Sequence, residues 1–200
     1  ISADLLRHLR TVSEPNLSPD GSLVAYTLSS IDTETMENCS RIVGLRLSGS
    51  DPFALTQGTT DSAPQFSPDG KSLAFLRNDE ENRRQLWILP MWGGEPYKVT
   101  HDESGILEFS WAPNSDRIAF SASTLSDVSE TLSNGSHIPK PKKVNNLRYQ
   151  FDTLGWRGDS HFHISILDIA SSNSRQITVG DWDDVSPKWS PDGKYIAFIS

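Results

Sequence analysis

The chain has 200 residues with a net charge of −8, and 36% of them are hydrophobic, which is enough to bury a sizeable core. This acidic balance argues against nucleic acid or an anionic membrane as a partner, because both attract basic surfaces. The single cysteine, Cys39, excludes an internal disulfide and favours a reducing compartment. We therefore expect a cytoplasmic location, or a periplasmic or secreted one if a leader was removed before Ile1. No run of 18 apolar residues is present to span a membrane.

Residues 1–15 are predicted to be a lead-in segment that precedes the repeated part of the chain. Ser2 can cap a short helix that carries Leu5, Leu6 and Leu9 on one side. The first turn motif follows this segment directly.

A Ser-Pro-Asp-Gly tetrapeptide occurs three times, and a fourth, degenerate copy reads Ala-Pro-Asn-Ser. The proline presets φ for a type I turn and the glycine accepts a positive φ, so each copy predicts the tip of a β-hairpin. Ser115 stands at the glycine position of the degenerate copy, where the same turn shape would hold a non-glycine residue at positive φ. The four copies begin at Ser18, Ser67, Ala112 and Ser190.

The spacing of the copies predicts the architecture. Ser18 and Ser67 are 49 positions apart, Ser67 and Ala112 are 45 apart, and Ala112 and Ser190 are 78 apart. Periods of about 40 to 50 residues are typical of four-stranded propeller blades, and the long interval indicates an insertion of roughly 30 residues. We place this inserted loop at residues 122–145 and predict an all-β propeller with about three and a half blades.

Each unit repeats the same strand pattern around its turn. The second unit predicts strands at Ala63–Phe66, Ser72–Arg77, Gln85–Leu89 and Glu95–Thr100. An aliphatic residue, an alanine and an aromatic residue follow every turn in fixed register, which predicts sheets buried on both faces with alanine where neighbouring blades approach most closely. The outer strands end on Leu55-Thr56, Val99-Thr100 and Ile177-Thr178.

A search for catalytic and cofactor motifs within these residues finds none. No Gly-x-Ser-x-Gly nucleophile elbow occurs; the nearest segments are 70–74, in a predicted strand, and 158–162, which lacks the final glycine. No phosphate-binding loop or dinucleotide fingerprint is present either, so we expect no cofactor. The sequence therefore predicts no catalytic residue in the chain.

Two groups of residues could bind a metal ion, but a structural role is favoured for both. His161 and His163 would lie on one face of a strand, without a recognisable third ligand. Asp181, Asp183 and Asp184 do not match the spacing of a calcium loop, so we interpret them as a solvated connection between blades. No metal site is predicted.

The sequence resembles the N-terminal propeller of the prolyl oligopeptidase family, in its acylaminoacyl-peptidase and dipeptidyl-aminopeptidase branch. The likeness covers nearly the whole chain and includes the Ser-Pro-Asp-Gly hairpins. The other segments that carry it are Ala3–Leu6, Val12–Gly21, Asn146–Trp156 and His161–Ile164.

The resemblance implies a propeller that caps a C-terminal α/β-hydrolase domain, expected beyond residue 200, and that admits only short or partly unfolded peptides. The partners would then be a peptide substrate and the chain's own hydrolase domain, with a homo-oligomer possible. Contact with substrate or with that domain would fall on a polar and aromatic run in which Arg148 and Tyr149 can alternatively be plain strand residues. The run comprises Arg148, Tyr149, Asp152, Trp156 and Arg157.

A rival interpretation comes from a different class of protein. Propellers of the TolB type share the Ser-Pro-Asp-Gly hairpin and act without catalysis, as scaffolds that bind partner proteins. Fold alone does not separate the two, because one fold hosts unrelated functions. A hydrolase domain in the same polypeptide would distinguish a peptidase from such a scaffold.

Overall fold

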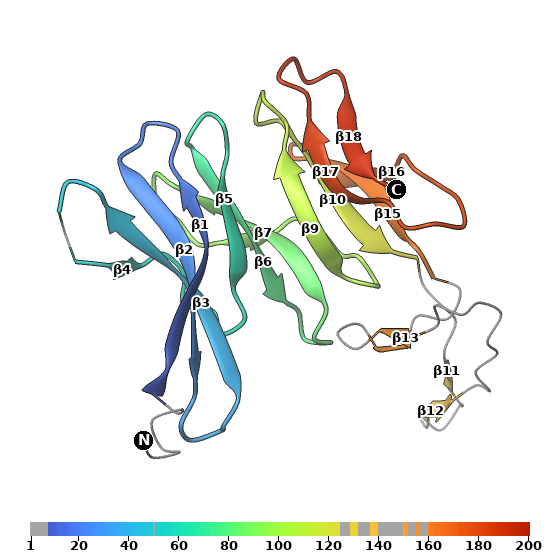
Figure 1. The fold of residues 1–200 in the computed structure, drawn as a ribbon, viewed down its shortest axis with the longest axis horizontal. Coiled ribbons are helices and arrows are strands. Elements are labelled where there is room, and N and C mark those ends of the chain that lie inside the picture. Colours follow the sequence, from blue (N-terminus) through green and yellow to red (C-terminus); the bar gives the residue numbers. More distant parts are fainter. Residues whose placement is uncertain are drawn as a thin grey trace.

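The computed structural model describes residues 8–49, 51–124, 129–131, 137–139, 150–151, 155–156 and 160–200. These residues form antiparallel sheets that we call blades I to IV (Figure 1). Blade I contains β1 (Arg10–Leu17), β2 (Leu23–Ile31), β3 (Asn38–Arg46) and β4 (Phe53–Ala54). Blade II contains β5 (Ser62–Phe66), β6 (Ser72–Asn78), β7 (Arg84–Pro90) and β8 (Tyr97–Lys98). Blade III contains β9 (Ile106–Trp111), β10 (Arg117–Ser123), β15 (Phe162–Asp168) and β16 (Asn173–Gln176), and blade IV contains β17 (Val185–Trp189) and β18 (Ile196–Ile199).

The predicted four-stranded propeller blades are confirmed. In blade II the first three strands lie within one residue of their predicted bounds. The outer strand is shorter than expected, because the ladder ends where Val99 N–H donates to the carbonyl of Leu86 at 2.9 Å and the side chain of Thr100 takes over the next hydrogen bond. The threonine hydroxyl thus replaces one step of backbone pairing.

The turns between the first two strands of the blades all lie at one end of the sheets (Figure 1). Gly21, Gly70 and Gly193 have φ values of 72°, 71° and 69°, and Ser115 has a φ of 62°. The degenerate turn therefore keeps the predicted shape with a non-glycine residue in the left-handed region. In the first turn, Ser18 Oγ donates to Asp20 Oδ1 at 2.6 Å and accepts from the backbone N–H of Leu23, and the copies at Ser67 and Ser190 repeat this network.

Both faces of blade II are buried against its neighbours. One face supplies Leu73 and Phe75 to a cluster that includes Ala25 and Ile42 of blade I. The other face supplies Ala74 and Leu76, among others, to a cluster with blade III. Ala25, Ala74 and Ala119 are fully buried, whereas the equivalent Ala197 of blade IV is exposed. The stacked sheets explain why consecutive residues of the second strand are apolar.

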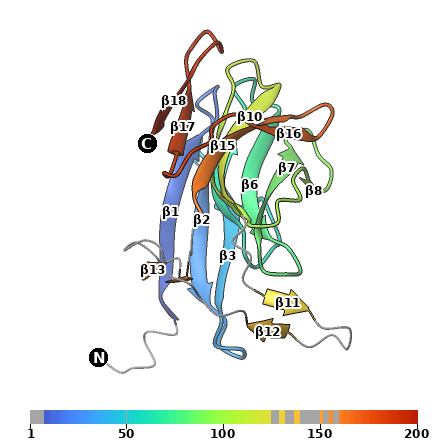
Figure 2. The ribbon, with the colours of Figure 1, turned by 90° about the vertical axis from the view of Figure 1, so that its right-hand side faces the viewer.

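The long interval between the third and fourth turns lies inside blade III. Strand β10 ends at Ser123 and β15 begins at Phe162, and two short hairpins occur between them. They are β11 (Ser129–Thr131) with β12 (His137–Pro139), and β13 (Gln150–Phe151) with β14 (Gly155–Trp156). Both lie beyond the end of blade III that is opposite its turn (Figures 1 and 2).

The first strand begins earlier than the predicted lead-in allowed. From Arg10 onward the segment pairs with β2, so it forms the inner strand of blade I and is no separate element. The predicted helix falls mainly on residues 1–7, outside the described part of the chain. Within the described ranges, no helix has the length and hydropathy needed to cross a bilayer.

Ser115 offers a test of the turn geometry. Glycine would relieve left-handed strain of about 1–2 kcal/mol, but it would lose the hydrogen bond from Asp69 N–H to Ser115 Oγ (3.1 Å). Alanine would lose the same hydrogen bond and keep the strain. We expect the free energy of unfolding of Ser115→Gly to be at least about 1 kcal/mol higher than that of Ser115→Ala, measured by urea denaturation. Equal stability of the two variants would contradict a left-handed residue here.

The turn carboxylates predict a pH dependence of stability. The hydroxyl of Ser67 and the backbone N–H of Lys71 hold the pKa of Asp69 below its usual value, and the same hydrogen bonds at the first turn lower the pKa of Asp20 to about 2. A lowered folded-state pKa stabilises the protein above the unfolded pKa, and this contribution is lost as pH falls through the folded value.

We therefore expect Asp69→Asn to reduce the free energy of unfolding near neutral pH, and the difference from wild type to shrink as the pH falls below about 4. Urea denaturation at each pH measures this difference. Asp51→Asn, at an exposed position before β4, is the matched control. A difference that stays constant across this range would show that the turn carboxylate does not act through its ionised form.

Candidate functional site

The end of the propeller opposite the turns gathers the connections between blades. Each inner strand runs towards its turn, so its first residue lies at this opposite end. The insertion of blade III follows the last residue of β10 and therefore begins at the same end. Asp61 N–H donates to the carbonyl of Ser40 at 3.0 Å, and Asp184 N–H donates to that of Phe162 at 2.7 Å. Each connection is thus fastened to the third strand of the preceding blade. We call this end the insertion face.

The inner strands β1, β5, β9 and β17 lie side by side, each at one edge of its sheet. Glu14, Ala63 and Ser186 have φ values of 52°, 53° and 58°, and each precedes a proline at a shift in strand register. A β-bulge of this kind turns a backbone N–H out of the ladder. The bulges therefore present hydrogen-bond donors to the neighbouring inner strand.

Carboxylates from neighbouring inner strands bind the N–H groups at two of these bulges. Glu14 Oε2 accepts from Ala63 N–H at 2.8 Å, which joins blades I and II. Glu108 Oε1 accepts from Ser186 N–H at 2.5 Å, which joins blades III and IV. Glu14, Ala63, Glu108 and Ser186 all stand four residues before the first residue of their turn. The same repeat position thus supplies both the acceptor and the donor.

The junction between blades II and III uses amide and indole groups instead. Gln65 Nε2 donates to the carbonyl of Phe109 at 3.0 Å, and Trp111 Nε1 donates to the carbonyl of Gln65 at 3.1 Å. In both kinds of junction, polar side chains satisfy inner-edge backbone groups that would otherwise be available to a ligand. Hydrogen bonds therefore join the inner strands of neighbouring blades throughout the described part of the chain.

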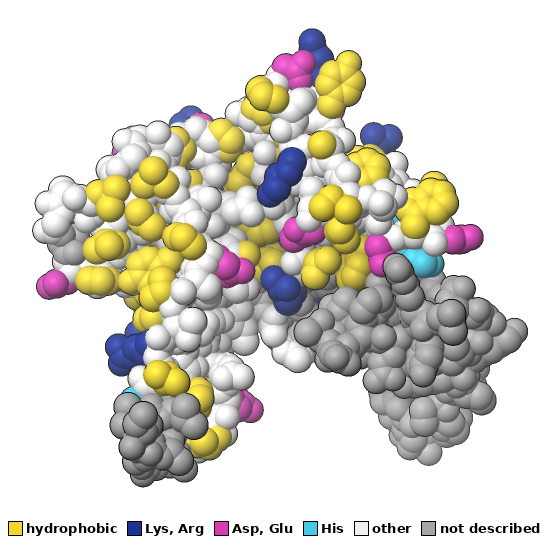
Figure 3. Space-filling view, viewed as in Figure 1, with side chains coloured by type: hydrophobic (Ala, Val, Ile, Leu, Met, Phe, Trp, Pro, Cys, Tyr) yellow, Lys and Arg dark blue, Asp and Glu magenta, His cyan; other side chains and the backbone are white. Residues whose placement is uncertain are grey.

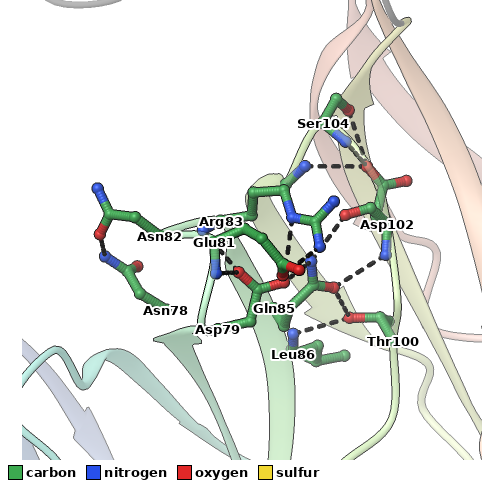
Figure 4. A network of polar contacts seen from close by, with 11 residues as sticks. Asn78, Asp79, Glu81, Asn82, Arg83, Gln85, Leu86, Thr100, Asp102 and Ser104 are labelled. Atoms are coloured by element: carbon green, nitrogen blue, oxygen red, sulfur yellow. Dashed lines mark hydrogen bonds and ion pairs between the residues drawn. The ribbon is translucent and has the colours of Figure 1, made fainter. Parts of the chain in front are cut away.

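A buried glutamine organises the insertion face below blade II (Figure 4). Gln85 is fully buried, and its Nε2 donates to the carbonyl of Asp102 at 2.7 Å. Its Oε1 accepts from Thr100 Oγ1 and from Asp102 N–H, each at 2.9 Å. Thr100 Oγ1 in turn accepts from Leu86 N–H at 2.9 Å. The side chain of Gln85 therefore holds the connection to blade III against the third strand of blade II by hydrogen bonds.

The predicted histidine and aspartate groups come together at the junction of blades III and IV. His163 Nδ1 lies 3.4 Å from Asp184 Oδ2, and His161 Nδ1 lies 3.7 Å from Asp183 Oδ1. The interpretation of Asp184 as part of a solvated connection is wrong, because this residue is buried against β15. The equivalent residue of blade II, Asp61, forms a bidentate ion pair with Arg77, with N–O distances of 2.6 and 2.9 Å.

These pairs do not make a metal centre. Within the described residues, no group of three His, Cys, Asp or Glu side chains is arranged to hold an ion. The aspartates instead anchor the start of an inner strand, through an arginine in blade II and a histidine in blade III.

The residues predicted to contact substrate are not placed by the structure. Arg148, Tyr149, Asp152 and Arg157 lie outside the described residues, and only the backbone of Trp156 is described, in β14 where it pairs with Gln150. Their role stays a prediction. Glu14, Glu108 and Gln85 were missed by the sequence reasoning, although the shared position of the two glutamates relative to their turns was a signal for them.

Comparison with known proteins finds peptidases that are similar along nearly the whole chain. No family model matches the chain. The uncharacterized peptidase YuxL of Bacillus subtilis is 29% identical over 206 residues, covering 99% of this chain and 31% of that protein. Dipeptidyl-peptidase 5 of Porphyromonas gingivalis is 26% identical over 216 residues, covering 100% of this chain and 31% of that protein. The chain is a β-propeller that is similar along nearly its whole length to these two peptidases.

Solved structures agree on the fold. An acylaminoacyl peptidase in complex with a chloromethyl ketone superposes with a TM-score of 0.75 at 19% identity, over 96% of this chain and 28% of that one. A putative TolB from Agrobacterium tumefaciens superposes with a lower TM-score of 0.56 at 17% identity, over 95% of this chain and 59% of that one. The resemblance to the prolyl oligopeptidase family is confirmed, and the chain spans about a third of the length of the curated relatives that it matches.

Substitutions of Thr100 test the hydrogen-bond network around Gln85. Valine has nearly the same shape but would leave the buried N–H of Leu86 without an acceptor, at a cost of about 1–3 kcal/mol. Serine would keep the hydroxyl and lose one methyl group, at a cost of about 1 kcal/mol. We expect Thr100→Val to lower the urea midpoint more than Thr100→Ser. The reverse order would mean that the methyl group, and not the hydroxyl, is the important part of this side chain.

Proposed function

We propose that this chain is the non-catalytic, substrate-gating propeller of a serine peptidase that hydrolyses short peptides near their N-terminus. The observation that carries the proposal is the similarity to two peptidases along the whole chain, which covers only 31% of each. The catalytic serine, aspartate and histidine would then lie in a C-terminal α/β-hydrolase domain of the same polypeptide. No motif for a nucleophile occurs in residues 1–200.

The ties between inner strands support a gating role. A propeller can exclude large substrates only if its blades stay together around the central opening. The carboxylate ties of Glu14 and Glu108 hold two junctions, and Gln65 with Trp111 holds the junction between them. The run that includes Arg148 and Arg157 remains our proposal for the surface that meets substrate or the hydrolase domain.

The catalytic part of the proposal is tested by labelling the full-length protein with a fluorophosphonate probe. We expect one serine outside residues 1–200 to react, within a Gly-x-Ser-x-Gly segment. Absence of any labelled serine, together with an open reading frame that contains no hydrolase domain, would favour the TolB-like scaffold. Labelling of a serine within residues 1–200 would show that the propeller itself is catalytic.

The gating part is tested by loosening one junction. Glu108→Ala removes the acceptor for Ser186 N–H, and we expect kcat/KM to rise severalfold for a long unfolded polypeptide and to change little for a chromogenic tetrapeptide. Glu103→Ala, at an exposed glutamate of the neighbouring connection, is the control. Parallel changes for both substrates would argue that access does not pass between these blades.

A further inference from the structure

A buried histidine and a buried aspartate are in contact at the junction of blades III and IV. The side chains of His163 and Asp184 are only 6% and 1% exposed, and His163 Nδ1 lies 3.4 Å from Asp184 Oδ2. Asp184 N–H also donates to the carbonyl of Phe162 at 2.7 Å, so the pair lies where the connection enters blade IV. A side chain whose charge depends on pH is therefore buried against the start of an inner strand.

The pair differs from its equivalent in blade II in the basic group that it uses. Asp61 and Asp184 both stand six residues before their turns, and Asp61 is paired with Arg77, ten residues after the start of its turn. The residue at that position in blade IV is Ser200, which has no charge. Arginine is always charged in proteins, whereas histidine changes its charge between about pH 5 and about pH 8. A titratable group thus replaces the fixed cation of blade II.

The surroundings of the pair are rich in carboxylates. The other titratable groups that face this end of blade III come from its own third strand and from the connections on both sides: His161, Asp183, Asp102 and Glu103. In the described part of the chain, no arginine or lysine forms an ion pair with His163 or Asp184. Figure 3 shows a histidine side chain beside acidic ones at the surface next to the grey residues. His161 is 23% exposed, so solvent reaches the edge of this cluster.

The charge on His163 decides how much net charge is buried. With a neutral imidazole, the pair carries the uncompensated negative charge of Asp184, and with an imidazolium it is a neutral ion pair. A buried charge costs free energy unless an opposite charge accompanies it. The folded junction then binds the proton of the pair more tightly than the unfolded chain does. By linkage, the stability of the junction falls as the pH rises through the range in which the pair loses this proton.

We propose that His163 and Asp184 form a pH-sensitive switch at the junction of blades III and IV. The protonated pair holds the start of β17 against blade III, and loss of the proton leaves a buried carboxylate without a counter-charge and loosens this contact. The effect on substrate access rests on the proposed gating function. A loosened junction would admit longer polypeptides at alkaline pH than at acidic pH.

The test is hydrogen exchange of the full-length protein, measured by mass spectrometry at about pH 5 and about pH 9, on either side of the range in which histidine titrates. After correction for the chemical exchange rate, we expect the amides of residues 184–186 to exchange at least about tenfold more slowly at the lower pH. Equal corrected rates at the two pH values would overturn the proposal.

Variants assign the effect to the pair. His163→Gln carries the side chain that blade II has at the same repeat position, because Ile164 and Leu86 each follow that position and donate to an equivalent threonine. Glutamine does not titrate, so the pH dependence of exchange should disappear. His161→Gln, at the more exposed histidine two residues away, is the matched control and should keep it. A pH dependence that persists in His163→Gln would also overturn the proposal.

A second variant identifies the partner of the histidine. Asp184→Asn keeps the shape of the side chain but removes the carboxylate, so it should abolish the pH dependence as His163→Gln does. The double variant should exchange at a rate that the two single changes do not add up to, because both remove the same interaction. A pH dependence that survives in Asp184→Asn would show that His163 acts on a different group, contrary to the proposal.

Substrate selection is measured separately from the switch itself. In the wild type, kcat/KM for a long unfolded polypeptide relative to that for a chromogenic tetrapeptide should rise severalfold with pH, and in His163→Gln this ratio should stay constant. A constant ratio in the wild type would remove the role of the switch in gating. Hydrogen exchange needs no reactive serine, so failure of fluorophosphonate labelling would remove the peptidase proposal and leave the pH-sensitive pair.

Discussion

Burial of each sheet on both faces is the constraint on which the rest of this structure depends. Ala74 faces blade III while its neighbour Phe75 faces blade I, so one strand must satisfy two interfaces with consecutive residues. Alanine at the contact lets the backbones of neighbouring sheets approach, and this closeness also brings the inner strands side by side. Only at that separation can Glu14 and Glu108 reach the bulged N–H groups of the next blade. Packing between blades therefore creates the polar ring at the centre.

The sequence predicted those parts of the fold whose causes are local. The turn network joins Ser18, Asp20 and Leu23 within five residues, and it depends on proline and glycine at fixed positions. Residue type alone therefore predicted the turn, including the left-handed Ser115. The spacing of the turns then predicted the blades. The outer strand was predicted too long because the hydroxyl of Thr100 substitutes for a backbone partner, which a pattern of apolar residues does not reveal.

The polar contacts between blades could not be predicted in the same way. Gln85 and Asp102 are 17 residues apart, and Glu108 and Ser186 are 78 apart with the insertion between them. Asp184 looked like one of several surface aspartates, yet it is buried because it starts an inner strand beneath blade III. Its environment is a property of the stacked blades. The repeat position of Asp61, six residues before its turn as Asp184 is before the fourth, becomes meaningful only once the structure shows what that position contacts.

Repeat proteins allow one blade to serve as the reference for another. Thr56, Thr100 and Thr178 occupy one repeat position, and each accepts a backbone N–H of the third strand in its blade. The role of this position is therefore to hold the sheet together. At the position of Gln85 and His163 the residue type differs between blades, but each side chain still contacts the connection to the next blade. Arg41 fits neither case, because it has the same backbone position but no partner among the described residues. Its side chain is exposed, and it lies on the opposite face of blade I from Ile42, which packs on blade II, so at this position blade I does not hold its connection through a side chain of the third strand.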